Sequence, residues 1–404
     1  MRKSITRLFI VLITPLLLAG CGDAATEGTE SNSQQTESKA ATESESVLET
    51  ETATQTEAVT ETESVTEAET VTETESESMI ETETEPEPSV TTFTISAVGD
   101  CAIGALQTHG YSGSFHQYYD KNGESYFFQN FKELFETDDV TLVNLEGVLT
   151  DETNRVEKNF NIKGYPEYAG ILTSSSIEAC SLGNNHTQDY GKASLTDTQE
   201  ALSGAGVLYA YNDTIAYYTT EDGIKVAMLS TSLFAKSKEK YLLNGIEKAR
   251  EEGADLIIAS CHWGKERVYY PTSYQQEAAH RLIDAGVDLV IGHHPHVLQG
   301  IEYYKGKLIC YSLGNFCFGA NRNPEDKNTI VFQQTFTFVD GELQDDIDAR
   351  IIPSRMSGKK NSNNYQPIIA TGEQAVDIID KMNEYSSPYS EVSFDKEGNL
   401  IINE

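Results

Sequence analysis

Short apolar runs and amphipathic stretches alternate along the chain from about residue 93 onward. Apolar runs rich in β-branched residues are typical of buried strands, and apolar residues spaced three and four apart are typical of helices. The apolar runs predict strands at 93–100, 140–146, 177–184, 225–231, 255–263, 287–294 and 308–315. Helical spacing predicts helices at 127–136, 192–206, 240–253 and 273–286.

This alternation of strands and helices predicts an α/β fold. Several helical stretches end at glycine, which commonly caps helix C-termini, and strand–helix–strand units favour right-handed crossovers between stacked layers. The run after residue 330 predicts a hairpin with an Asp340-Gly341 turn, and a last helix is expected at 372–386. We therefore expect residues 93–404 to form one large domain, a layered α/β sandwich.

The N-terminus has the pattern of a secretion signal. Three basic residues precede an apolar stretch at 8–18 that is too short to span a bilayer. The following Leu-Ala-Gly-Cys resembles a bacterial lipobox, which implies cleavage before Cys21 and lipid attachment to it. We expect residues 1–21 to be a lipoprotein signal peptide and the mature bacterial protein to be lipid-anchored on the extracytoplasmic face of the cell membrane. The alternative is an ordinary signal peptide in which Cys21 is incidental.

Residues 22–92 are of low complexity and are dominated by threonine, serine and glutamate. Between Asp23 and Glu87 there are 20 acidic residues and one lysine, which account for about half of the formal net charge of −35. Such a segment buries too little apolar surface to offset the entropy of ordering, so we expect a disordered acidic stalk. A binding tail for a basic partner is the alternative. The acidic balance argues against nucleic acid as a partner, because phosphates are bound by lysine and arginine.

Polar residues that can bind a metal follow one predicted strand after another. The densest case is Gly-His-His-Pro-His at 292–296, which holds three of the eight histidines and follows the apolar run at 287–291. In open α/β sheets, ligands bind at the carboxyl ends of strands. If these strands share one parallel sheet, their polar groups converge on one edge. The other residues in such positions are Asp100, Asn144, Glu146, Asn185, His186, Asp189 and His262.

Carboxylate, amide and imidazole groups together form a mixed oxygen and nitrogen ligand set. This set suits Mn, Zn or Fe better than Ca or Mg. Each residue also has a structural explanation: Asp100 as a helix N-cap, Glu146 as a turn residue and His262 as a core histidine. Their recurrence at successive strand ends favours a site for one or two divalent metal ions over these separate explanations.

Six segments, in order, resemble the CapA family: VGDCAIG, NLEG, GNNHTQDYG, HWGKE, GHHPHVLQGIE and YSLGNF. The resemblance extends from about residue 93 to 320. The CapA family is linked to poly-γ-glutamate capsule synthesis and export, and it is similar to the calcineurin-like metallophosphoesterases. The resemblance implies a metallophosphoesterase-type sandwich in residues 93–404, with poly-γ-glutamate and a capsule synthesis complex as partners.

The metallophosphoesterase resemblance implies a role for each matching residue. His186 matches the histidine that protonates a leaving oxygen, and Asp189 is placed to orient it. Asn144 is a less favoured alternative to Glu146 as the bridge between two metals, and His293 is a neighbour without an assigned role. The implied metal ligands are Asp100, Glu146, Asn185, His262, His294 and His296.

The sequence departs from the family pattern at the first metal motif. That motif is normally Asp-x-His, but residue 102 is alanine. The aspartate usual at the bridging position is also replaced, by Glu146. Both changes weaken the expectation of a two-metal phosphoesterase and leave the expectation of a one-metal site in place.

Two functional interpretations remain open at this stage. In the first, the protein is a surface-anchored CapA-like component of poly-γ-glutamate synthesis or export with a metal-dependent, phosphoesterase-like hydrolase site. In the second, it is a non-catalytic component of an envelope polymer export complex and binds metal or polymer. Metal content and turnover distinguish the two, and neither the substrate nor the metal follows from the residues alone.

Overall fold

The structure is a computed structural model, and it describes residues 87–389 and 392–403. The predicted signal peptide with Cys21, and the predicted stalk up to residue 86, lie outside the described residues. The first strand begins at Val90, shortly before the predicted start of the domain. Among the described residues, no helix has both the length and the apolar character that a membrane span requires.

Nine of the described strands form the larger of two main sheets: β1 (Val90–Ala102), β3 (Val140–Leu145), β6 (Ala179–Ser181), β7 (Leu208–Ala210), β14 (Asn315–Phe318), β15 (Asn328–Val339), β16 (Glu342–Leu343), β17 (Asp348–Arg355) and β18 (Ile368–Ile369). The main order is β18-β17-β15-β1-β3-β6-β7. β1 is central, since it runs parallel to β3 and β14 and antiparallel to β15. We call this the nine-stranded sheet.

The second main sheet has six of the described strands: β8 (Ala216–Thr219), β9 (Lys225–Ser232), β10 (Leu256–His262), β11 (Leu289–His293), β12 (Ile301–Tyr304) and β13 (Lys307–Cys310). Their order is β12-β13-β11-β10-β9-β8. The four central strands, β9, β10, β11 and β13, are parallel, and an antiparallel strand closes each edge. We call this the six-stranded sheet.

The described helices are α1 (Phe115–Asn122), α2 (Lys132–Phe135), α3 (Ala169–Thr173), α4 (Gly191–Ala205), α5 (Glu239–Glu251), α6 (Ser273–Asp284) and α7 (Glu373–Ser386). Three short 3-10 turns lie at Glu124–Tyr126, Pro166–Tyr168 and Lys236–Lys238. Two small sheets complete the described part of the chain: β2 (Ala105–Leu106) with β5 (Ile162–Gly164) and β4 (Val148–Leu149), and β19 (Val392–Phe394) with β20 (Leu400–Ile402).

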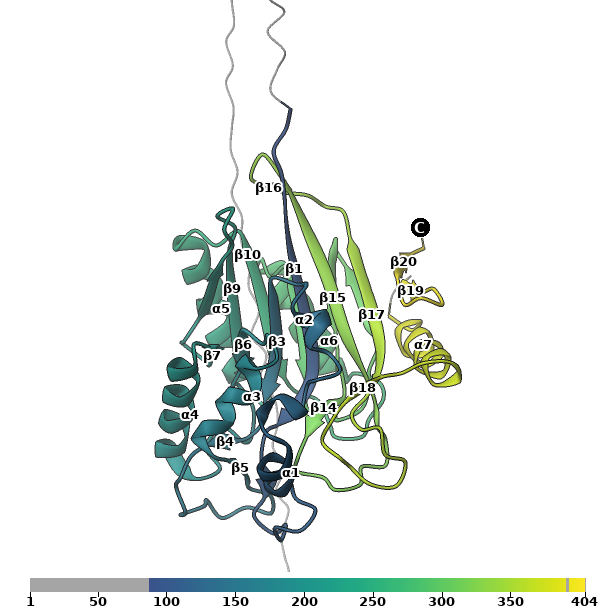
Figure 1. The fold of residues 1–404 in the computed structure, drawn as a ribbon. Coiled ribbons are helices and arrows are strands. Elements are labelled where there is room, and N and C mark those ends of the chain that lie inside the picture. The colour runs from purple at the N-terminus through teal and green to yellow at the C-terminus, as the bar shows by residue number, and fades with distance from the viewer. Residues whose placement is uncertain (1–86, 390–391, 404) are drawn as a thin grey trace, which may run out of the picture. The chain divides into compact units, whose positions relative to one another are not determined.

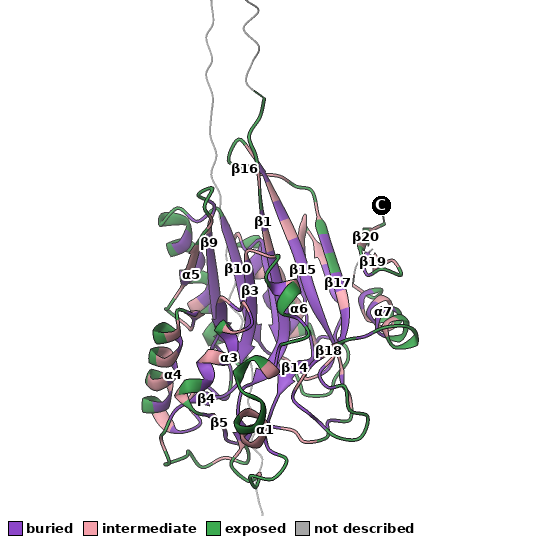
Figure 2. Cartoon of the chain, in the orientation of Figure 1, coloured by how far each residue is buried: buried purple, intermediate pink, exposed green. Residues whose placement is uncertain are grey.

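The two main sheets pack face to face with helices outside them (Figure 1). Ile95 of β1 and Ile258 of β10 belong to the apolar core between the sheets. The next residues along these strands that face outward, such as Val98 and Ala259, belong to separate cores under α1–α4 and under α5 and α6. Both faces of each sheet are therefore buried, which explains the continuous apolar runs in the sequence. Figure 2 shows the central strands as buried and the exposed residues on the outer helices.

The predicted layered α/β sandwich is confirmed, and each predicted strand and helix corresponds to an observed one. The Asp340-Gly341 turn is also present, with φ of 52° and 82°, which are the positive values of a tight hairpin turn. The predicted helix at 127–136 is reduced to α2, because Phe127 and Phe128 are used to fill the core under the nine-stranded sheet.

The strands whose ends carry the candidate ligands do not share one parallel sheet but are divided between two. β1, β3 and β6 lie in the nine-stranded sheet, whereas β9, β10, β11 and β13 lie in the six-stranded sheet. The sequence pattern predicts where the strands lie but not which strands pair, because strands of both sheets are equally apolar where they face the shared core. The polar strand ends therefore meet across two sheets rather than along one edge.

A close backbone approach joins the end of β1 to the chain that leaves the six-stranded sheet. The Asp100 N–H donates a hydrogen bond to the Gly314 carbonyl oxygen at 2.8 Å. A Cβ atom on Gly99 would lie 2.0 Å from the same oxygen. Glycine at position 99 is therefore required for the approach that places Asp100.

We expect Gly99→Ala to lower the free energy of unfolding by about 3 kcal/mol, at the upper end of the usual cost of overpacking. The added methyl group would meet a backbone oxygen, which no side-chain rotation can move. Urea denaturation measures this change. The matched control is Gly204→Ala in α4, where an added Cβ meets nothing within 4 Å. The control should be neutral or stabilise by up to about 1 kcal/mol, and equal effects of both substitutions would contradict the account.

Candidate metal centre

The predicted site residues meet where strands of the two sheets end. Asp100 lies near the end of β1 and Glu146 directly follows β3. His262 is the last residue of β10, and it pairs in register with His293, the last residue of β11. Asn185 and His186 follow β6. The site is therefore held by the backbone hydrogen bonds of both sheets.

Glu146 lies at the centre of the site and is fully buried. Its Oε1 atom is 3.7 Å from His186 Nε2, 3.7 Å from His296 Nε2 and 4.0 Å from His262 Nε2. Within the described residues, neither of its carboxylate oxygens has a hydrogen-bond partner. Burial raises the pKa of Glu146 well above its usual range, since no donor compensates for the loss of water.

Asp100 is also fully buried but has several partners. Its Oδ1 accepts a hydrogen bond from Asn144 Nδ2 at 2.8 Å, and its Oδ2 accepts one from the His294 backbone N–H at 3.2 Å. His296 Nδ1 lies 3.0 Å from Oδ2. Burial opposes ionisation of Asp100, but its contacts with His293 and His296 outweigh burial and hold its pKa well below the usual range. Asp100 is therefore a stable carboxylate.

The loop after β11 holds two histidines in left-handed backbone conformations, with φ of 96° at His294 and 57° at His296. Such conformations are strained for residues with a Cβ atom, and they persist where the surroundings enforce them. Burial, followed by the charge of His296, lowers the pKa of His294 to about 4. Burial lowers the pKa of His296 too, but Glu146 and Asp100 outweigh it and raise that pKa to about 10.

His262, at the end of β10 in the six-stranded sheet, contacts two asparagines that belong to or follow strands of the nine-stranded sheet. Its Nε2 is 2.8 Å from Asn185 Oδ1, and its Nδ1 is 3.3 Å from Asn144 Nδ2. Burial lowers the pKa of His262 well below its usual range, so this imidazole is neutral at pH 7. A neutral imidazole is the form that binds metal.

The chemistry of these groups fits a divalent cation. Two ligand sets each have their ligand atoms within 4.8 Å of one another and share Glu146. In the described part of the chain, His293 Nε2 and His294 Nδ1 are also buried and lack hydrogen-bond partners, like the oxygens of Glu146. Buried polar atoms are rarely left without partners in proteins. A divalent cation bound among these oxygens and nitrogens would provide the partner that they lack. The sets are Glu146, His294 and His296, and Asp100, Glu146 and His262.

His186 is held at the edge of this centre by a carboxylate behind it. Its Nδ1 is 2.8 Å from Asp189 Oδ2, which also accepts the Ile162 backbone N–H at 2.5 Å. Lys158 forms an ion pair with Asp189, and its Nζ lies 3.2 Å from His186 Nδ1. These contacts orient the ring so that Nε2 faces Glu146.

Ala102 provides no ligand at the first metal position. Its side chain belongs to a small apolar cluster with Ile162, Phe318 and Met356. Asn315, at the start of β14, is the polar group beside His296 instead, with Oδ1 3.0 Å from His296 Nδ1. The departure from the family pattern is therefore accompanied by apolar packing around residue 102.

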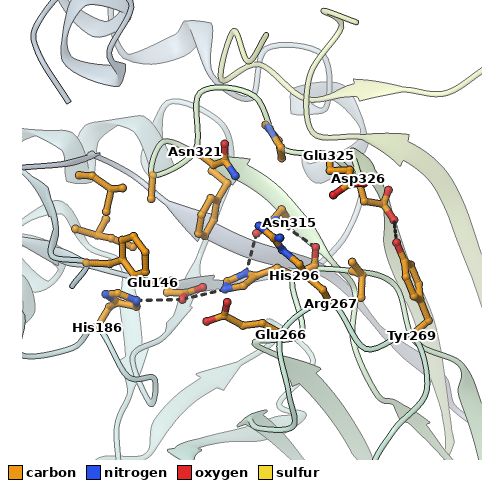
Figure 3. Close-up of a pocket in the computed structure, with 17 residues that line it drawn as sticks. Glu146, His186, Glu266, Arg267, Tyr269, His296, Asn315, Asn321, Glu325 and Asp326 are labelled. Carbon is orange, nitrogen blue, oxygen red and sulfur yellow. Dashed lines mark hydrogen bonds and ion pairs between the residues drawn. The ribbon is translucent and has the colours of Figure 1, made fainter. Parts of the chain in front are cut away.

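A cavity of about 390 Å³ opens beside the centre (Figure 3). Glu146, His186 and His296 line its inner end, and Figure 3 shows them side by side. One part of the wall is apolar, and the remainder carries charged groups. The apolar lining residues are Leu106, Phe160, Ile162, Val297, Phe318, Ala320 and Pro324, and the other polar ones include Glu266, Arg267, Tyr269, Asn315, Asn321, Glu325 and Asp326.

The structure brings together all eight residues that the sequence singled out as ligands or acid–base groups. Their roles in metal binding and catalysis remain predictions. Sequence reasoning missed Lys158 and the ring of Phe234, whose centroid lies 4.6 Å from that of His294. It also gave Asn144 only the role of an alternative bridge, whereas Asn144 links Asp100 to His262. No motif marks Lys158 or Phe234, because both lie in irregular segments.

We expect Mn²⁺ or Zn²⁺ to raise the melting temperature of the EDTA-treated protein by about 5 °C or more. A ligand at 100 times its Kd contributes about 2.7 kcal/mol, and 1 kcal/mol shifts the melting temperature by about 2–4 °C at this size. Glu146→Gln should abolish the shift without destabilising the metal-free protein, because glutamine is neutral and burial already disfavours the charged form of Glu146.

The matched control is Glu178→Gln, at a partly buried glutamate that accepts the Thr141 N–H away from the site. It should retain the full metal-induced shift. A shift that survives in Glu146→Gln, or that is lost equally in the control, would contradict the assignment of Glu146. Differential scanning calorimetry provides the measurement.

The chain is similar in sequence to proteins named for capsule biosynthesis. The "Capsule biosynthesis protein CapA" of Bacillus anthracis is 32% identical over 227 residues, which are 49% of this chain and 55% of that protein. The "PGA biosynthesis protein CapA" of Bacillus subtilis (strain 168) is 28% identical over 255 residues, 57% of this chain and 66% of that protein. The matched part of the chain thus spans about half to two thirds of the length of these relatives.

Among solved structures, a hypothetical protein from Thermus thermophilus aligns with 65% of this chain and 99% of its own, at 15% identity and a TM-score of 0.41. The pattern of the family described as "Bacterial capsule synthesis protein PGA_cap" matches residues 94–320. That segment is more than half of the chain and contains all eight site residues. The chain therefore belongs to the PGA_cap family of bacterial capsule synthesis proteins, in agreement with its resemblance to CapA.

Proposed function

We propose that this protein acts in the synthesis or export of a capsule polymer and that its centre is a metal-dependent hydrolase site. Membership of the capsule synthesis family, and relatives named for capsule and PGA biosynthesis, support the first part. The second part rests on Glu146 at the inner end of a cavity. This buried carboxylate stands among three imidazoles and has no hydrogen-bond partner in the part of the chain that the structure describes.

Different residues would bind the metal and donate the proton during hydrolysis. Glu146, His294 and His296, or Asp100, Glu146 and His262, would hold a divalent cation, which would supply Lewis acidity at the bond to be cleaved. His186, anchored through Nδ1 by Asp189, presents Nε2 to the cavity and can donate a proton to the leaving group. The apolar wall of the cavity limits water around the substrate.

A second function is favoured by one observation. Ala102 and its apolar neighbours replace a histidine ligand, so the first metal position has fewer donors than the family pattern provides. A centre with one weakened position can retain a cation, and bind polymer through it, without cleaving a bond. In that case the protein is a non-catalytic binding component of an envelope polymer export complex.

Turnover distinguishes the two functions. Purified protein with Mn²⁺ should hydrolyse bis(p-nitrophenyl) phosphate or poly-γ-glutamate, and EDTA should abolish the reaction. His186→Gln should lower kcat by about 10²–10⁴, the usual contribution of a general acid, while metal-induced stabilisation is retained. The control is His280→Gln, because His280 pairs with Glu302 outside the site. Metal binding without turnover of either substrate would favour the non-catalytic function.

The proposal includes anchoring to the membrane through Cys21, on the extracytoplasmic face. It is supported by the lipobox-like sequence that ends at this residue. We expect Cys21→Ser to move the protein from the membrane fraction to the soluble fraction of the producing bacterium, because the acyl chains provide the anchor. Labelling with radioactive palmitate should be lost in the same variant. Palmitate incorporation that persists in Cys21→Ser would contradict the anchor.

A further inference from the structure

Among the described residues that line the cavity, Arg267 is a cation without an ion-pair partner. Four carboxylates line the same cavity, and Arg267 is the one lysine or arginine among its described lining residues. Within the described part of the chain, the Arg267 guanidinium forms no hydrogen bond, ion pair or ring contact. Figure 3 draws it on the wall between His296 and Tyr269. A guanidinium that forms no ion pair with the carboxylates around it is available to a ligand.

The backbone fixes Arg267 close to the metal centre. Its N–H donates a hydrogen bond to the Pro295 carbonyl oxygen at 2.8 Å, so Arg267 is tied to the loop that carries His294 and His296. Arg267 has a φ of 60°, a left-handed conformation like those of the two histidines. Strained backbone of this kind gathers at functional sites, where it directs side chains. The strain thus extends from the predicted ligands to Arg267.

The wall of the cavity that carries Leu106, Phe160, Ile162 and Phe318 has a different character. These side chains are apolar, and Phe160 keeps 60% of its surface exposed. The cavity volume of about 390 Å³ lies in the range of small-molecule sites, which combine apolar walls with a few placed polar groups. A ligand with an aliphatic body and an anionic group fits this arrangement.

We propose that Arg267 is the specificity-determining residue of the site and binds an anionic group, carboxylate or phosphate, on the substrate beside the bond to be cleaved. This proposal rests on the proposed function. The planar guanidinium presents paired N–H donors that match a carboxylate or phosphate. The four carboxylates that line the cavity repel anions, so a cation on the same wall favours the entry of an anionic group.

The test measures anion binding by the whole protein without metal, and it therefore does not depend on turnover. EDTA-treated protein is titrated with glutarate, with inorganic phosphate and with the neutral diamide glutaramide, and binding is followed by NMR. Arg267→Asn removes the charge, and asparagine tolerates the left-handed backbone. The matched control is Lys265→Asn, which removes the same charge from an exposed neighbour that does not line the cavity.

We expect wild-type protein to bind glutarate or phosphate more tightly than glutaramide. Arg267→Asn should weaken that binding by about tenfold, and Lys265→Asn should leave it unchanged. Preference for glutarate identifies a carboxylate on the substrate, and preference for phosphate identifies a phosphate. The proposal is overturned if neither anion binds, if Arg267→Asn binds as well as wild type, or if both variants weaken binding equally. If the wild-type protein binds the anion through Arg267 but cleaves no substrate, the hydrolase function is overturned and the anion-binding role of Arg267 stands.

Discussion

The buried carboxylate of Glu146 is the constraint on which the rest of the site depends. Removing an ionised carboxylate from water costs several kcal/mol unless charges or hydrogen bonds replace the water. Here three imidazoles stand about 4 Å away, and within the described residues neither oxygen of Glu146 has a hydrogen-bond partner. A divalent cation would compensate for this cost. The surrounding strand ends place their carboxylates and imidazoles where a bound cation would provide the positive charge that Glu146 requires.

The two buried carboxylates differ because of their environments. Asp100 is surrounded by donors, and its pKa lies well below the usual range. Glu146 has no donor in residues 87–389 and 392–403, and its pKa is raised by burial. His294 and His296 differ in the same way, since burial keeps the former neutral while two carboxylates favour the charged form of the latter. A cation held by Glu146, His294 and His296 would favour the ionised form of Glu146 and the neutral form of His296, which would reduce these differences.

The strands and most helices could be predicted from local pattern, because a strand with both faces buried needs a continuous apolar run. The candidate ligand residues could be picked out as a group because each follows such a run, and the structure brings them together. The division of the strands into two sheets could not be predicted, since packing between segments that are distant in the sequence decides which strands pair. Lys158 and Arg267 were not singled out from the sequence for a related reason. Their importance comes from Asp189, Pro295 and the cavity, which the sequence does not show to be near them.

The central claim is that strand ends from two sheets hold a divalent cation around Glu146. Anomalous X-ray diffraction at the manganese edge, from crystals grown with Mn²⁺, tests it most directly. We expect an anomalous peak within coordination distance of the Glu146 carboxylate and of at least one imidazole of His262, His294 or His296. Crystals of metal-saturated protein without a peak at Glu146, or with peaks only at surface carboxylates, would contradict it.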